Sequence, residues 1–485
     1  RAPTVYTTFS FRALARGPDR TARRKLIVRD WRGSAVVSVA SLFGADADVL
    51  GDRSFRLLLL ANVNIAAGTV LVSPMLASLT GPFGVTDAEA GLLLSAFTAP
   101  GILGIPVVGV VADRVGRRPL LVGGLTVFGL AGAAVALVTD FRAALVLRAL
   151  QGVGFACVLP VVIATIGDLY EGAAEAAAQG FRFTSSGLTQ ALIPAGVGVV
   201  ASVSWRYPFL LYVVALPAAA LIHARFDTDR AADPEPVPNG GGTDEPTPSP
   251  GTEAVTDQVP DDRSDDGERA DEGSYLRELL WLATRPRVVA VLVALGLGMF
   301  LYTGLLTYNS FLVVRVLSGT PGQAGLLVTA LSVSYAASAS QAGRISAAVN
   351  RPVALLAGNG VMALGLVGVG LAPSFPVAVT GSAVMGAGTG VLFSLLRSSV
   401  TRLAPETLRG GLVGIAEATI RLTASIAPLG TGLIVVALEP ATGSVGAIRW
   451  ALVAVGVAGA VVVAVALLAG TLSPPVRTGA AADGD

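Results

Sequence analysis

Twelve long apolar stretches constrain the fold of this sequence more than any other feature. A helix needs about 20 largely apolar residues to cross a bilayer. The stretches of about this length are residues 57–79, 89–111, 120–138, 143–166, 184–203, 207–224, 288–312, 322–345, 353–372, 377–396, 412–436 and 449–472. Strands of a membrane barrel would be about ten residues long and would alternate in polarity. We therefore predict an all-α membrane protein with twelve membrane-spanning helices.

The composition excludes several kinds of chemistry. Hydrophobic residues make up 53% of the chain and charged residues only 14%, which is more apolar than a soluble domain requires. Lysine, histidine and cysteine each occur once, as Lys25, His223 and Cys157. A phosphate-binding loop with its lysine, a Ser-His-Asp triad, a Cys/His zinc site and an internal disulfide are therefore not expected. We predict a protein that is not an enzyme, holds no metal or cofactor and binds no nucleic acid.

Arginine residues gather on one side of the predicted membrane. With the N-terminus inside, the inner connections contain Arg114, Arg117, Arg118, Arg182, Arg344, Arg351, Arg402 and Arg409, whereas the outer connections or helix ends contain Arg142, Arg206, Arg315 and Arg449. Positive residues favour the cytoplasmic side of a membrane. The bias predicts a multi-pass protein of the cell membrane with both termini in the cytoplasm.

Composition also divides the chain into segments. The region after residue 225 is rich in Asp, Glu, Pro and Gly and has no apolar periodicity, which is typical of a disordered linker. It separates six apolar stretches from six. The predicted segments are a basic cytoplasmic tail (1–53), a six-helix bundle (54–225), an acidic cytoplasmic linker (226–275), a second six-helix bundle (276–473) and a cytoplasmic tail (474–485).

The two halves match each other at one constant spacing along the chain, here called the repeat offset. Identical residues at this offset are Ala90-Gly91-Leu92-Leu93 with Ala324-Gly325-Leu326-Leu327, Gly109 with Gly343, Arg117 with Arg351, Gly152 and Gly154 with Gly386 and Gly388, and Pro194, Gly196 and Gly198 with Pro428, Gly430 and Gly432. An unbroken register indicates a duplicated six-helix unit. Because each copy contains an even number of spans, the two copies would be related by an axis along the membrane normal. Rocking of the two bundles would then expose a central cavity to each side of the membrane in turn.

Two motifs resemble signatures of a known family. The stretch GVVADRVGRRPLL, which begins at Gly109, resembles the G-x-x-x-D-R-x-G-R-R loop between helices 2 and 3 of the major facilitator superfamily, and RALQGVG, which begins at Arg148, resembles its helix 4 signature R-x-x-Q-G-x-G. With twelve spans, a middle linker and the repeat, the resemblance covers residues 55–475. It implies two six-helix bundles related by a pseudo-two-fold axis and a transport function.

The charged loop is a candidate cytoplasmic gate. Its residues are Gly109, Asp113, Arg114, Gly116, Arg117 and Arg118, together with Asp168 at the end of helix 4. Gly116 would give the tight turn its backbone freedom. Asp113 lies at the C-terminal end of its helix, where the helix dipole disfavours a negative charge, so its carboxylate needs a partner. The resemblance implies that Asp113 faces the start of helix 11 near Arg409 and that Arg117 pairs with Asp168. Positive-inside topology alone is the alternative, although it does not explain Asp113.

The second copy of this loop differs from the first. It has Ala347 where the first copy has Asp113, and Asn350 where the first has Gly116. The gate is therefore expected to be one-sided.

Three charged residues lie deep within predicted spans and are candidates for coupling. Glu417 and Arg421 are four residues apart and so share a helix face near mid-membrane, where a charge costs about 2.5–3.5 kcal/mol. They could carry a proton or form an ion pair that only supports packing. Arg148 could line the cavity, as the resemblance implies, or extend to the outer surface.

Polar residues within spans are candidates to contact a substrate. They are Asn64, Gln151, Gln190, Tyr302, Tyr308, Asn309, Tyr335 and Ser394. Each could equally form a hydrogen bond between helices.

The predicted function is transport of a small molecule by alternating access. The stretch GLTQALIPAGVG resembles the helix 5 signature G-x-x-x-G-P-x-x-G-G of the 12-helix drug:proton antiporters, although Ile193 and Val197 replace two of its glycines. We predict proton-coupled multidrug efflux of amphipathic compounds by a monomer in the lipid bilayer. Proton or sodium symport of a sugar or small organic acid is one alternative, and a membrane receptor or scaffold without transport is another.

Overall fold

The computed structural model describes residues 49–226, 275 and 277–472. The predicted tails (1–53, 474–485) and acidic linker (226–275) lie almost wholly outside these residues. The described residues belong to one compact unit, and the contacts between the two halves of the chain lie within it.

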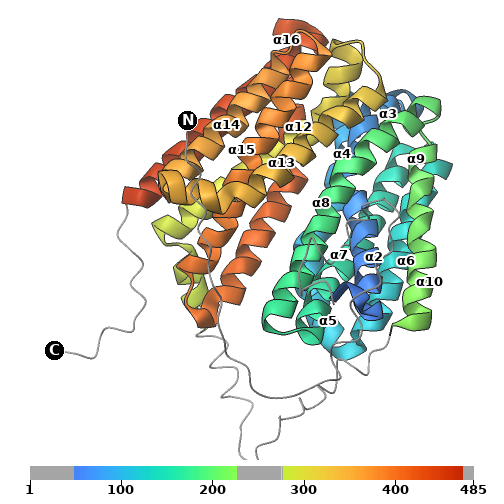
Figure 1. Cartoon of the computed structure of the whole chain (residues 1–485). Coiled ribbons are helices and arrows are strands. Elements are labelled where there is room, and N and C mark those ends of the chain that lie inside the picture. The colour runs from blue at the N-terminus through green and yellow to red at the C-terminus, as the bar shows by residue number, and fades with distance from the viewer. Residues whose placement is uncertain (1–48, 227–274, 276, 473–485) are drawn as a thin grey trace, which may run out of the picture. The chain divides into compact units, whose positions relative to one another are not determined.

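Helices account for both halves of the described chain. The first half comprises α2 (Arg53–Val70), η2 (Ser73–Met75), α3 (Leu76–Phe83), α4 (Asp87–Thr98), α5 (Pro100–Val115), α6 (Arg117–Ala134), η3 (Val135–Leu137), α7 (Phe141–Leu169), α8 (Gly172–Val203), α9 (Tyr207–Leu210), η4 (Leu211–Val214) and α10 (Ala215–Arg225). The second half comprises α12 (Pro286–Phe311), η6 (Leu312–Val316), α13 (Pro321–Val349), α14 (Arg351–Gly370), α15 (Phe375–Leu403), η7 (Glu406–Leu408) and α16 (Arg409–Leu472). Figure 1 shows the two halves as separate groups of helices, here called the N-terminal and C-terminal bundles.

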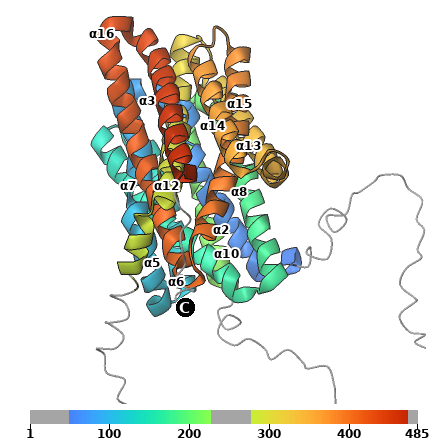
Figure 2. The ribbon, with the colours of Figure 1, turned by 90° about the vertical axis from the view of Figure 1, so that its left-hand side faces the viewer.

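The helices are consistent with twelve membrane crossings. Nine helical segments of the described chain are long and apolar enough to span a bilayer. One of them, α16, contains two helices that join at Gly443, where φ is 69°. Figure 2 shows α16 in orange-red and red. Two further crossings are α4 with α5, which meet at Pro100, and α13, whose second half contains Ser, Gln and Arg residues. The predicted all-α architecture is confirmed.

Helix starts recur at the repeat offset. Thr86 begins α4 with a capping box to Glu89, and the equivalent Thr320 begins α13 with a capping box to Gln323. A capping box satisfies free N–H groups of the first turn, so the same local chemistry fixes both starts.

The connections α5–α6 and α13–α14 are also equivalent. Gly116 has φ 90° in the first, and Asn350 has φ 61° in the second. Both combine a positive φ with an extended ψ, a conformation that glycine adopts most easily and that is strained for other residues. Asn350 also accepts a hydrogen bond from the backbone N–H of Val353, 3.1 Å away. The predicted need for backbone freedom at Gly116 is confirmed.

Helix packing inside each bundle follows the same offset. A Cβ atom on Gly152 would overlap the carbonyl oxygen of Phe97, and one on the equivalent Gly386 would overlap that of Leu331, which is itself the equivalent of Phe97. Small residues allow membrane helices to approach this closely and gain van der Waals contact. The recurrence confirms that the fold is a duplicated unit.

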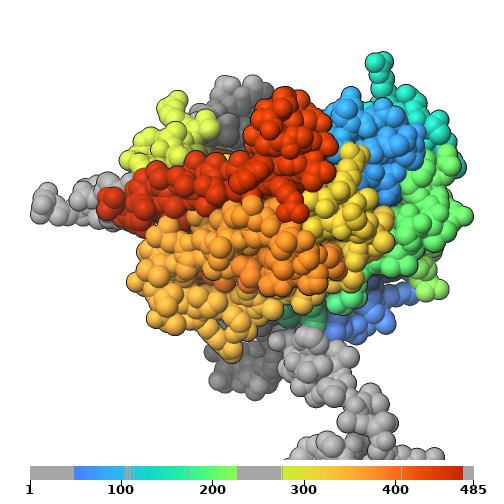
Figure 3. Space-filling model, turned by 90° about the horizontal axis from the view of Figure 1, so that it is seen from above, coloured from blue at the N-terminus to red at the C-terminus, as the bar shows by residue number. Residues whose placement is uncertain are grey.

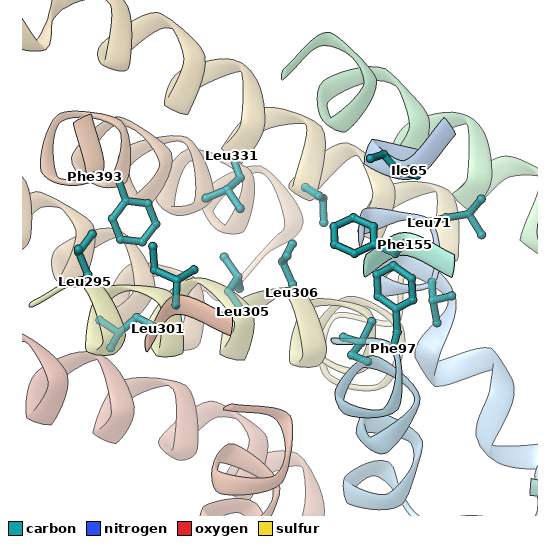
Figure 4. Packing of buried hydrophobic residues seen from close by; sticks show 14 of the residues in the cluster. Ile65, Leu71, Phe97, Phe155, Leu295, Leu301, Leu305, Leu306, Leu331 and Phe393 are labelled. Atoms are coloured by element: carbon teal, nitrogen blue, oxygen red, sulfur yellow. The ribbon is translucent and has the colours of Figure 1, made fainter. Parts of the chain in front are cut away.

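A continuous apolar core runs through both bundles. Figure 4 shows Phe97, Phe155 and Ile65 of the N-terminal bundle near Leu306 of α12, and Leu305 and Leu331 further into the C-terminal bundle. Among these, Leu305 and Leu331 are completely buried. This packing holds the polar residues of the two bundles against each other at their interface.

Replacing Gly386 by Ala is expected to destabilise the C-terminal bundle by about 1–3 kcal/mol, because the methyl group overpacks the crossing with Leu331. The melting temperature of the purified protein in detergent measures this. Gly360→Ala in α14 is the control, since a Cβ atom at Gly360 would have nothing within 4 Å. Equal melting temperatures for the two variants would contradict the prediction.

Candidate functional site

We name the two ends of the bundles after two glycines that each lie between consecutive helices. The Gly84 end is where α3 is followed by α4, and the Gly116 end is where α5 is followed by α6. Both α8 and α16 begin at the Gly116 end, and α15 finishes there.

Hydrogen bonds join the bundles at the Gly84 end. Ser73 donates to the carbonyl of Leu306 over 2.5 Å and accepts from the amide of Asn309 over 2.7 Å. Ser310 donates to the carbonyl of Pro74 over 2.9 Å. These groups are buried, and bonds between membrane helices contribute about 0.6 kcal/mol each on average. They fix η2 of one bundle against α12 of the other.

An ion pair lies at the same end. Arg315 in η6 is 2.7 Å from a carboxylate oxygen of Asp87 at the start of α4, and it also donates to the hydroxyl of Thr80 over 3.0 Å. Asp87 is the less exposed partner, with 13% of its side chain accessible against 41% for Arg315. Seen from this end in Figure 3, blue and green atoms of the N-terminal bundle lie against yellow atoms of the C-terminal bundle.

Two close helix crossings complete this closure. In the α4–α16 crossing, Gly91 lies against Pro428. In the α8–α13 crossing, Gly325 lies against Pro194, so both crossings use residues related by the repeat offset. In the described part of the chain, the polar contacts between bundles lie at the Gly84 end or midway, as in the 3.0 Å bond from Ser425 to Thr98. The described conformation is therefore closed at the Gly84 end.

Between the bundles, on the Gly116 side of these contacts, lies a group of charged residues that we call the arginine cluster. Its members are Arg182 on α8, Arg397 on α15, and Glu417 and Arg421 on α16. They are about 9 to 18 Å from the helix ends at the Gly116 end. Glu417 and Arg397 form an ion pair of 3.2 Å, with 40% and 47% of their side chains exposed.

The other two arginines stack on aromatic rings. The guanidinium of Arg421 lies 4.9 Å from the ring centre of Phe155 on α7, a contact that crosses between the bundles. The guanidinium of Arg182 lies 4.2 Å from the ring centre of Phe183. Both arginines are close enough to the Glu417–Arg397 pair for its charges to act on them.

This arrangement corrects two sequence interpretations. The sequence allows Glu417 to pair with Arg421 one turn away, but its partner is Arg397 on another helix. The arginine bias places Arg182 in an inner connection, yet α8 begins at Gly172 and the side chain is buried. Arg397 itself escaped prediction because the apolar stretch ends just before it, whereas α15 continues to Leu403.

Arg148 lies neither at the outer surface nor between the bundles. It is completely buried inside the N-terminal bundle, where it donates to the carbonyl of Leu93 over 3.1 Å and to the side chain of Gln151 over 2.5 Å. Its guanidinium is 4.5 Å from the ring centre of Phe97 and 3.3 Å from the hydroxyl of Tyr212. Arg148 and Gln151 thus cross-link α4, α7 and η4, and both expected placements of Arg148 are wrong in this conformation.

The loop residues at the Gly116 end are only partly brought together. Arg117 forms the expected ion pair with Asp168. Arg118 donates to the carbonyl of His223 on α10, and Arg114 is exposed. The side chain of Asp113 and residue Gly109 lie outside the described side chains, so a contact with the region of Arg409 is not part of the structure. Their role in a gate stays a prediction.

The polar candidates fall into separate places. Tyr308 and Asn309 are buried at the contacts of the Gly84 end, and the side chain of Asn64 donates to its own helix at Leu60 over 2.8 Å. Tyr335 lies near Arg397 and Glu417, and Tyr302 lies near Tyr335. Gln190 and Ser394 are half-buried.

One buried polar residue escaped prediction from the sequence. The amide of Asn62 on α2 donates to the carbonyl of Arg182 over 3.0 Å and to the hydroxyls of Ser185 and Ser186 over 3.0 and 2.8 Å. Asn62 therefore holds the part of α8 that carries Arg182. The signal in the sequence was that Asn62, like Asn64 two residues later, is a polar residue within an apolar stretch.

The fold and the repeat define a two-bundle membrane transporter. The sequence matches the profile of the Major Facilitator Superfamily over residues 58–318 and 291–484. The chain belongs to this family.

Two curated relatives are transporters by name, and one of them is an exporter. The bacillibactin exporter of Bacillus subtilis (strain 168) is 31% identical over 149 residues, which are 29% of this chain and 37% of the relative. The multidrug transporter protein MdtP of the same organism is 30% identical over 171 residues, which are 33% of this chain and 31% of the relative. The matched region thus spans about a third of the length of these relatives.

Among solved structures, a bacterial homolog of the human lysosomal transporter Spinster, in an inward-facing and unoccupied conformation, is similar over 87% of this chain and 98% of its own. The TM-score is 0.68 at 17% sequence identity. This likeness shows the fold.

Asp87→Asn is expected to loosen the Gly84 end, because it removes the ion pair with Arg315. In a Cys157→Ala background, a cysteine at the buried position Thr307 reports access, since Thr307 lies against Gly91 across the interface. Its labelling by a membrane-impermeant maleimide should rise by about 2- to 5-fold, as expected for a pair worth up to about 1 kcal/mol.

Glu89→Gln is the control for this experiment. Glu89 lies in the same helix turn but only completes the capping box, which Gln also supports. Equal labelling of both variants would show that the ion pair does not hold the bundles together.

Proposed function

We propose that this chain is a secondary active exporter of small organic compounds in the cell membrane. Both termini lie in the cytoplasm, so the Gly116 end faces the cytoplasm and the Gly84 end faces outward. The name of the bacillibactin exporter, which this chain resembles over about a third of that protein's length, supports the direction, and the arginine bias supports the orientation. A single chain supplies both bundles and the interface between them, so a monomer is sufficient.

The ion pair between Glu417 and Arg397 is the observation that supports a coupled mechanism. It lies between the bundles, and both side chains are partly exposed although they lie within spanning helices. Among the acidic residues whose side chains are described, Glu417 is the one that lies deep inside a spanning helix, two turns from the start of α16 at Arg409 and far from the turn at Gly443. Ionisable groups inside a membrane domain commonly mark proton relays. Protonation of Glu417 would remove its charge and release Arg397, so the coupling ion is a proton.

Contacts at the two ends of the bundles account for alternating access. In the described conformation the Gly84 end is closed, so substrate enters from the Gly116 end. Opening of the Gly84 end requires the bonds at Ser73 and the Asp87–Arg315 pair to break. In the opposite conformation Asp113 would hold the Gly116 end closed, with Arg117 and Asp168 supporting the loop.

Proton symport of a small organic acid is a second candidate. The excess of arginine over glutamate between the bundles favours it, because an acid and a proton would attract each other in one site. Everted membrane vesicles distinguish the two functions. In an exporter, substrate added outside such vesicles is accumulated when the interior is acidified, whereas a symporter discharges preloaded substrate together with protons.

Glu417→Gln is expected to reduce proton-driven transport by at least about tenfold, since the amide cannot release a proton and no longer balances Arg397. The measurement is uptake into everted vesicles of a panel of aromatic compounds of different charge, with and without a protonophore. Glu439→Gln is the matched control, because Glu439 is an exposed residue of the same helix near the turn at Gly443. Full protonophore-sensitive transport by Glu417→Gln would rule out this residue as the proton carrier.

A further inference from the structure

The arginine cluster has more positive than negative charge. Three guanidinium groups, those of Arg182, Arg397 and Arg421, lie near one carboxylate in the described part of the chain. Glu417 forms its ion pair with Arg397. Arg182 and Arg421 are left without a carboxylate partner among the described residues. Cations within a membrane domain are costly unless they meet an anion or reach water, so this cluster is suited to an anion that the chain itself does not provide.

Both of these arginines are held so that their N–H groups can bind a ligand. Arg421 stacks on Phe155 and Arg182 on Phe183, and stacking occupies the face of a guanidinium while leaving its edges available. The Nε of Arg421 is buried and has no hydrogen-bond partner among the described residues. The Nε of Arg182 donates to Gln179 over 2.8 Å, which fixes that side chain and leaves its other N–H groups.

The two arginines come from different bundles. Arg182 is on α8 of the N-terminal bundle, where Asn62 supports its backbone, and Arg421 is on α16 of the C-terminal bundle. Both lie near the same Glu417–Arg397 pair. An anion bound to both would therefore bridge the bundles, which is where a substrate must act to change their relative position.

We propose that Arg182 and Arg421 bind the anionic group of the transported compound and that the substrates are organic acids with an apolar or aromatic body. A carboxylate accepts two parallel N–H bonds from a guanidinium edge, which gives both affinity and orientation. Phe155 and Tyr335 lie beside the cluster and can contact the apolar part. The proposal rests on the transport function proposed above and names its substrate class. An inside-negative membrane potential favours outward movement of an anion, which agrees with export.

Three probes with one ring system test the charge preference: 1-naphthoate, the uncharged 1-naphthamide and the cationic 1-naphthylmethylamine. Binding to the full-length protein is measured in nanodiscs of phosphatidylcholine, which offer no competing anionic headgroups. We expect 1-naphthoate to bind at least about tenfold more tightly than the other two. Arg421→Gln and Arg182→Gln should each weaken its binding by roughly tenfold or more, as expected when a charge-assisted hydrogen bond is lost. Arg421→Lys should retain part of the affinity.

Arg344→Gln is the control, because Arg344 is an exposed arginine of α13 that bonds to Gln341 outside the cluster. Melting temperatures of all variants separate loss of binding from loss of folding. Tighter binding of the cation than of the anion, or unchanged 1-naphthoate binding in folded Arg421→Gln and Arg182→Gln proteins, would overturn the proposal. Restoration of binding only by phosphatidylglycerol would assign the arginines to lipid headgroups and would also overturn it.

Binding and vesicle transport together separate the anion site from the export function. Proton-driven transport of cationic or neutral compounds that is unaffected by the arginine variants would leave export standing and reject the anion site. Arginine-dependent 1-naphthoate binding without proton-driven accumulation of any probe in everted vesicles would support the anion site and reject export.

Discussion

The close approach of the two bundles at the Gly84 end is the constraint on which the rest of the structure depends. Two crossings bring glycine against proline, Gly91 to Pro428 and Gly325 to Pro194, with little or no room for a side chain on either glycine. Hydrogen bonds and an ion pair surround these crossings. Because the bundles meet there, Arg397 and Glu417, which lie nearer the Gly116 end, remain partly accessible.

The chemistry of the site follows from charges held within a largely apolar fold. The chain keeps few ionisable residues inside its helices, and the described ones separate into two kinds. Arg148 is bonded to Leu93, Gln151 and Tyr212 within one bundle, where it cross-links helices, although one of its terminal nitrogens is buried without a hydrogen-bond partner among the described residues. The arginines between the bundles are held by rings and one carboxylate and so retain capacity for a ligand. The position of a charged residue within an apolar stretch of the sequence does not show which of these two kinds it belongs to.

The sequence was sufficient for the fold and insufficient for the pairing of charges. Apolar length, the repeat offset and the loop signature predicted the helices, the duplication and the Arg117–Asp168 pair, because each depends on local pattern or on a family motif. The partner of Glu417 could not be predicted, since Arg397 is on a different helix and near the end of it. The surroundings of Arg148 could not be predicted either, because they depend on how α4 packs against α7. The predicted gate contact of Asp113 lies outside the described side chains.

The two halves also differ in how they anchor the loop at the Gly116 end. Asp168, which pairs with Arg117, corresponds to Arg402 in the second copy, and there Arg351 binds the carbonyl of Leu395 and the hydroxyl of Ser399 instead. One loop is thus anchored by opposite charges and the other by neutral acceptors. Ionic strength screens the first type of anchor far more than the second. The duplicated architecture therefore contains two equivalent connections that differ in their sensitivity to salt.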